Sequence, residues 1–293
     1  MPDTYARSKV LYLTLDAERD RGNAANVAGL KSAAQKWDGA PALEIEQAWW
    51  GDLMALDAEA LDRKFRPFML FLSGSFTEWQ EYGRNRDWAR LVDSWSAMVQ
   101  QTHVPILAVC GSHQLLAKTF GQGWDAIGHM TREALPEIAI ARELATSPPS
   151  DLIPSPRLGE HGTFPLYAPR WAEDDPLLAR GLGRRVMHFT ESHADQVLRK
   201  GIGWDFVEIL APAKDEDALP LPGSPAPAPR DRCKVQALRW VGDERVMYSL
   251  QFHPELPIHP DFQGDLRAQA EALGTDGEML LLNFFDVARL HWG

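Results

Sequence analysis

Short apolar runs alternate with longer segments of helical periodicity along the first 120 residues. The pattern predicts buried strands at residues 10–15, 42–46, 68–72 and 105–109, and helices at residues 24–36, 88–101 and 112–120. The longest of these helices repeats apolar side chains at Trp88, Leu91, Val92, Trp95 and Met98, which is the spacing of one helix face. Such alternation is typical of an α/β fold with a mainly parallel, open sheet and helices on both faces.

The second half of the chain has shorter apolar runs separated by turns. Strands are expected at residues 186–189, 206–210, 234–240 and 246–252, and the last two form a hairpin that turns at residues 241–244. A C-terminal helix is expected over about residues 262–290. Proline-rich stretches without a period predict loop insertions at about residues 131–158 and 211–232. The whole chain, residues 1–293, is expected to form a single domain of this class.

Composition narrows the class of protein. The net charge is −11 and no basic run of five residues occurs, which argues against nucleic acid as a partner. No apolar run approaches the roughly 18 residues that span a bilayer, and no signal peptide is visible, so no membrane partner is expected. Two cysteines do not make a disulfide framework, which favours a cytoplasmic protein. The histidines show no metal-ligand spacing, so neither a metal nor another cofactor is expected.

One of the two cysteines, Cys110, stands where a predicted strand meets a predicted helix. A sharp turn there pushes the sulfur out of the sheet, and the helix N-terminus favours a thiolate. The neighbours Ala108, Gly111 and Ser112 are small enough for such a turn, and the Gly111 N–H can point at a carbonyl under attack. A lone cysteine after an apolar run is more often a small buried side chain, so a catalytic role requires a base and a group that orients it.

The stretch YSLQFHPE, at residues 248–255, offers that base. His253 and Glu255 are two residues apart in extended chain, so their side chains project to the same side, and Pro254 stiffens the backbone between them. A further stretch, LSGSFTEW at residues 72–79, follows the third predicted strand, at the sheet edge where open α/β folds gather their sites. Taken alone, its Ser-Gly-Ser indicates only a turn.

Four ordered segments together resemble the class I, or triad, glutamine amidotransferases. They are Ser73-Gly74-Ser75-Phe76, the 108–114 segment AVCGSHQ, the 191–197 segment ESHADQV, and Phe252-His253-Pro254-Glu255. The resemblance implies Cys110 as nucleophile, His253 as general base and acid, and Glu255 as its orienter. It also implies an oxyanion hole from the N–H of Gly111 and one from Gly74 or Ser75. Gln114, Ser192 and His193 match family positions that line the glutamine pocket.

The same resemblance implies a reaction, namely hydrolysis of the glutamine side-chain amide to glutamate and ammonia through a Cys110 thioester. No phosphate loop or spare domain for a synthase is visible, so either the ammonia acceptor is a separate synthase subunit, as the resemblance implies, or there is none. Two alternatives stay open: a γ-glutamyl hydrolase acting on peptides or amines, and a non-catalytic regulatory or binding protein. The family's elbow glycines are Ala108 and Ser112 here. In the oxyanion loop, Ser75 stands for a glycine, and a serine reaches glycine-only backbone angles at a cost.

Overall fold

The computed structural model describes residues 7–17, 19, 23–75, 77, 79–129, 160–182, 186–193, 195–213, 218–221 and 233–293. The expected loop insertion at residues 131–158 lies outside these ranges. Among the helices within them, none combines the length and the hydropathy required to cross a bilayer.

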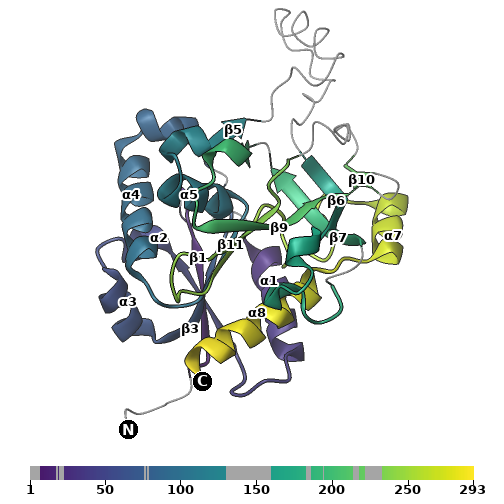
Figure 1. Cartoon of the computed structure of the whole chain (residues 1–293), viewed down its shortest axis with the longest axis horizontal. Coiled ribbons are helices and arrows are strands. Elements are labelled where there is room, and N and C mark those ends of the chain that lie inside the picture. Colours follow the sequence, from purple (N-terminus) through teal and green to yellow (C-terminus); the bar gives the residue numbers. More distant parts are fainter. Residues whose placement is uncertain are drawn as a thin grey trace, which may run out of the picture.

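The centre of the molecule is a parallel sheet (Figure 1). Its strands run in the spatial order β2 (Glu44–Trp49), β1 (Lys9–Thr14), β3 (Pro67–Leu72), β4 (Ile106–Val109) and β12 (Met247–Leu250). Every residue of β3 and β4 is buried, as expected for strands covered on both faces. Because the strands are parallel, their carboxyl ends meet at one edge of the sheet.

Alternating side chains of β1 face two separate cores. Val10 and Tyr12 pack with α1 (Ala24–Lys36) and α8 (Gly277–Trp292). Leu11 and Leu13 pack on the other face, which is covered by α2 (Trp50–Leu53), α3 (Ala58–Phe65), α4 (Arg86–Gln101) and α5 (Gly111–Phe120). The predicted α/β architecture with helices on both faces is therefore confirmed.

An antiparallel extension continues the sheet beyond β12. The hairpin partner β11 (Ala237–Trp240) is followed by β9 (Phe206–Pro212), β6 (Glu160–Tyr167) and β10 (Leu219–Pro220), and β7 (Val186–His193) also pairs with β6. A separate pair joins β5 (Ile127–His129) to β8 (Asp195–Val197). Short 3₁₀ turns lie at Trp79–Gly83, Gly123–Ala126, Arg170–Ala172, Pro176–Leu178 and Arg199–Gly201.

Two expected boundaries are wrong. The described part of the predicted loop at residues 211–232 includes sheet, because β9 runs to Pro212 and pairs with β6, and β10 pairs with β6 as well. Residues 214–217 and 222–232 of this predicted loop lie outside the described ranges. The expected single helix over residues 262–290 is two helices, α7 (Gly264–Leu273) and α8. Gly274 separates them with a φ of +70°, a left-handed conformation in which a helix ends.

Candidate active site

Cys110 occupies a strained turn between β4 and α5. Its φ of 53° and ψ of −113° lie in a region that non-glycine residues avoid, at a cost of about 1–3 kcal/mol. The turn is held because the Cys110 N–H donates to the Leu250 carbonyl at 2.7 Å and its own carbonyl accepts from Gln114 at 3.1 Å. The side chain is thereby fixed at the carboxyl edge of the sheet beside the first turn of α5, as expected for a nucleophile elbow.

The His-Pro-Glu segment is held between the two helices of the opposite face. A Cβ atom on Gly29 of α1 would lie 1.7 Å from the Glu255 carbonyl oxygen, and one on Gly277 of α8 would lie 2.2 Å from that of Pro254. Only glycine allows this close approach. Within the segment, His253 Nδ1 lies 2.9 Å from Glu255 Oε1, and the Glu255 carboxylate is fully buried.

The thiol and the imidazole flank the same glycine. A Cβ atom on Gly74 would lie 3.5 Å from Cys110 Sγ and 3.4 Å from His253 Cε1. Burial lowers the pKa of His253, but the charges of Glu255 and Cys110 and hydrogen bonds to both outweigh it and raise that pKa to about 10. His253 is therefore protonated at neutral pH and ready to give a proton to a leaving group.

The loop after β3 contacts the start of α5. A Cβ atom on Gly111 would lie 2.8 Å from the Ser75 nitrogen, so the loop backbone at Ser75 packs directly against Gly111. Neither N–H has an acceptor within the described ranges. Among the non-glycine residues of these ranges, only Arg66 and Cys110 have a positive φ, so Ser75 carries no glycine-only angle and the strain anticipated for it is absent. Ser75 and Gly111 thus line the same cavity as Cys110, with backbone N–H groups that have no acceptor in the part of the chain that the structure describes.

The nucleophile, the imidazole and the oxyanion loop border one cavity of about 410 Å³. Its lining includes Cys110, His253, Gly74, Ser75, Gly111, Gln114, Ser192 and His193. The Gln114 side chain is engaged inside the protein, since its Oε1 accepts from Trp79 Nε1 at 2.6 Å and its Nε2 donates to the Asp195 carbonyl at 2.6 Å. It therefore braces the cavity wall with both polar atoms already paired.

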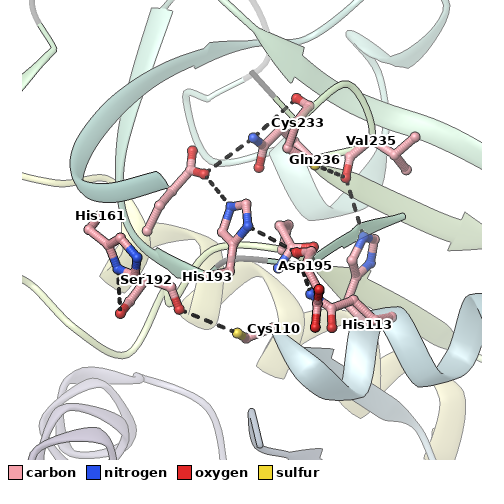
Figure 2. A network of polar contacts seen from close by, with 12 residues as sticks. Cys110, His113, His161, Ser192, His193, Asp195, Cys233, Val235 and Gln236 are labelled. Carbon is pink, nitrogen blue, oxygen red and sulfur yellow. Dashed lines mark hydrogen bonds and ion pairs between the residues drawn. The ribbon is translucent and has the colours of Figure 1, made fainter. Parts of the chain in front are cut away.

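In the wall made by β7 and β8, the buried His193 ring makes two polar contacts, of which Figure 2 shows the one with Asp195. His193 Nε2 lies 2.9 Å from Glu191 Oε2, and its Nδ1 lies 3.1 Å from the Asp195 carbonyl oxygen. The carbonyl oxygen of Ser192, the residue between Glu191 and His193, lies 3.7 Å from Cys110 Sγ. The His193 ring thus fixes the backbone that faces the sulfur.

His113, which follows Cys110 in the turn segment, is a buried residue that links neighbouring elements of the fold. Complete burial lowers its pKa to about 3, even though a hydrogen bond to the Val235 carbonyl acts in the opposite direction. The neutral ring lies 2.9 Å from Ser249 Oγ. It also lies 3.3 Å from the Val235 oxygen, as Figure 2 shows. It ties α5 to β12 and to the segment before β11.

Two site residues escaped the sequence analysis. Asn26, in the first turn of α1, donates from Nδ2 to Glu255 Oε1 at 2.7 Å. Asp16, just past β1, accepts from the Thr77 N–H at 3.1 Å and so contacts the loop after β3. A signal existed for Asp16, a polar residue at the carboxyl end of a buried strand. Asn26 lies in a helix with no motif around it, so only the fold reveals its contact.

Comparison with known proteins gives structural matches only. No family model and no curated protein sequence matches this chain. A glutamine amidotransferase from Thermotoga maritima matches with a TM-score of 0.54 at 11% identity, covering 97% of this chain and 98% of the other. The glutaminase domain of CTPS from Trypanosoma brucei, with bound acivicin, matches with a TM-score of 0.55 at 14% identity, covering 97% and 94%.

A protein from Thermoplasma acidophilum, described as a candidate subunit of GMP synthase, matches with a TM-score of 0.57 at 14% identity, covering 97% of this chain and 95% of the other. All three matches extend over nearly the full length of both chains. At such low identity they establish the architecture alone. The chain has the class I glutamine amidotransferase fold, with a mostly parallel open sheet flanked by helices.

Proposed function

We propose that this protein is a cysteine-nucleophile glutamine amidotransferase that hydrolyses the glutamine side-chain amide to glutamate and ammonia. The observation that carries the proposal is that Cys110 and His253 line one cavity, with Glu255 buried behind the His253 ring. Gly111 and Ser75 line the same cavity, and their N–H groups have no acceptor among the described residues. A nucleophile, a proton carrier with its orienter and oxyanion donors are the parts that acyl transfer requires.

Acylation begins with attack of the Cys110 thiolate on the amide carbon. The new C–S bond forms while the carbonyl oxygen becomes an oxyanion, which the N–H groups of Gly111 and Ser75 stabilise. His253 is charged at neutral pH because Glu255 lies against its Nδ1. It gives its Nε2 proton to the leaving nitrogen, so the C–N bond breaks, ammonia departs and a γ-glutamyl thioester remains.

Deacylation runs the same machinery in reverse. The imidazole of His253, now neutral, takes a proton from a water molecule that attacks the thioester carbonyl. The oxyanion forms again at the same two N–H groups, the C–S bond breaks, and glutamate leaves while the thiolate and the imidazolium are restored. Glu255 keeps Nδ1 protonated throughout, which leaves Nε2 free for the proton transfers.

The ammonia passes, in this proposal, to a separate synthase subunit. The names of two structural neighbours support it, since one is a glutaminase domain of CTPS and the other is a candidate subunit of GMP synthase. A second candidate function, hydrolysis of γ-glutamyl peptides or amines by the same chemistry, is favoured by the cavity. Its volume of about 410 Å³ lies in the range, about 300–1,000 Å³, that accommodates drug-sized ligands.

The test is ammonia release from glutamine by the purified protein, with γ-glutamyl amines and peptides assayed in parallel. Hydrolysis of glutamine that is abolished by Cys110→Ala supports the proposal. The matched control is Cys233→Ala, which removes the other thiol, also buried, and is expected to leave the rate unchanged. Hydrolysis of the conjugates alone would establish the second candidate. No hydrolysis of either class would refute both.

A further inference from the structure

The carboxylate of Asp16 is buried directly beneath the loop after β3, the oxyanion loop at residues 73–77. Its Oδ1 accepts from Ser75 Oγ at 3.2 Å, from the Thr77 N–H at 3.1 Å and from Thr77 Oγ1 at 3.3 Å. Asp16 is 1% exposed. Because β1 and β3 are adjacent parallel strands, the residues that follow them meet at the same edge of the sheet. One carboxylate oxygen therefore collects three donors from the loop.

Asp16 is itself held in place. Its backbone carbonyl accepts from the indole N–H of Trp49, at the end of β2, at 3.0 Å. The Ala17 N–H donates to Thr77 Oγ1 at 3.0 Å, which adds a second link between the same two segments. Hydrogen bonds thus link the C-terminal end of the oxyanion loop, at Thr77, to the residues that follow β1, and Asp16 is in turn bonded to the end of β2.

The N-terminal end of the oxyanion loop, at Ser73, is hydrogen-bonded to α5. Ser112 Oγ donates to the Ser73 carbonyl at 2.6 Å, and both side chains are buried. Ser75, which supplies one of the two free N–H groups, therefore lies between two fixed points, Ser73 on α5 and Thr77 on Asp16. Ser75 and Ser112 both stand at positions where the glutamine amidotransferases that the sequence resembles have glycine. Both hydroxyl groups make hydrogen bonds that hold this loop.

We infer that Asp16 is the positioning residue of the oxyanion hole, with Ser112 as the second anchor. The inference rests on the proposed acyl-transfer chemistry. It assigns Asp16 no contact with substrate: the carboxylate acts through the loop, by keeping the Ser75 N–H beside that of Gly111. Loss of one oxyanion donor typically lowers the rate about 100- to 1,000-fold. Loosening a donor costs less than removing it, so a decrease of about 10- to 100-fold is expected when Asp16 is removed.

The test compares two reactions of the same sulfur. Acylation of Cys110 by p-nitrophenyl acetate passes through an oxyanion, whichever amide is the natural substrate. Alkylation of Cys110 by iodoacetamide forms no oxyanion and reports only the nucleophile. The ratio of the two rate constants isolates the oxyanion hole. We expect Asp16→Ala to lower this ratio about 10- to 100-fold and to leave alkylation unchanged. Asp16→Asn keeps an acceptor oxygen and is expected to restore most of the ratio.

Because a buried aspartate can matter for folding, the double variant Ser75→Ala/Ser112→Ala provides an independent route. It removes the Ser75 hydrogen bond to Asp16 and the Ser112 hydrogen bond to Ser73, and it is expected to lower the ratio of acylation to alkylation. The matched control is Ser94→Ala on α4. The Ser94 hydroxyl oxygen accepts from Trp50 Nε1 of α2, and neither residue lines the cavity. A ratio unchanged in both variants, or a parallel loss of acylation and alkylation, would overturn the inference. Wild-type acylation by the ester without ammonia release from glutamine would instead count against the proposed substrate.

Discussion

Replacing Glu255 by glutamine removes the charge that keeps His253 protonated. The pKa of His253 rises from 6.5 to about 10 in the folded protein, and one pKa unit corresponds to about 1.4 kcal/mol, so the rise represents about 5 kcal/mol. Coulomb attraction across the 2.9 Å between Nδ1 and Oε1 gives about 6 kcal/mol at an effective dielectric constant near 20. This attraction is of the same size as the net rise, and Glu255 is the largest of the contributions that raise the pKa, ahead of Cys110.

In Glu255→Gln, burial then outweighs the remaining contacts, and we expect the pKa of His253 to fall by about four units. The assay is an NMR titration of the His253 ring carbon resonance, assigned with a His253→Asn variant. Glu278→Gln, on the exposed part of α8, is the matched control and should leave the titration unchanged. A Glu255→Gln protein in which His253 still titrates near pH 10 would refute the role given to this carboxylate.

The same pair makes stability depend on pH in a defined direction. A histidine whose pKa is raised on folding stabilises the native state fully below the unfolded pKa of 6.5. That contribution is lost as the pH rises through the folded value of about 10. Urea unfolding of the wild type should therefore show a decreasing free energy of unfolding between pH 6.5 and 10. Glu255→Gln should flatten this dependence.

Three further substitutions test single contacts. Asn26→Ala removes a donor to the Glu255 carboxylate. It should lower the free energy of unfolding in urea by about 1.5–3 kcal/mol and kcat for glutamine about tenfold. A variant with the wild-type free energy of unfolding and kcat would contradict this. Gly111→Ala places a Cβ atom 2.8 Å from a backbone nitrogen and should lower kcat at least about tenfold, while Gly83→Ala, with open space around it, should not. Glu191→Gln replaces the buried carboxylate that His193 Nε2 contacts at 2.9 Å and should cost about 1–3 kcal/mol in urea unfolding. Glu208→Gln, in a pair with an exposed arginine, should cost about 0–1 kcal/mol, and equal losses in the two variants would argue against this reasoning.

Local sequence was sufficient for the features that depend on near neighbours. The strand-to-helix turn at Cys110 was predictable because small residues surround a cysteine between an apolar run and a helical pattern. The contact between His253 and Glu255 followed from their spacing of two in extended chain. The parallel sheet followed from the alternation of strands and helices.

Other features depend on tertiary packing and left little trace in the sequence. The strand β6 contains Gly162 and Pro165, which weaken a strand pattern, and it exists because β7 pairs along its whole length. The contact of Asn26 with Glu255 joins residues 229 positions apart and needs Gly29 to let α1 approach. The anchoring of the oxyanion loop by Asp16 likewise appears only when the ends of β1 and β3 are brought together.

The most direct measurement of the central proposal is rapid-quench mass spectrometry of the protein during turnover with glutamine. We predict a γ-glutamyl adduct on the peptide that contains Cys110, formed at the rate of the first turnover, and none on the peptide that contains Cys233. Ammonia release that continues undiminished in Cys110→Ala, with no adduct on the wild-type peptide, would contradict thioester chemistry at this sulfur.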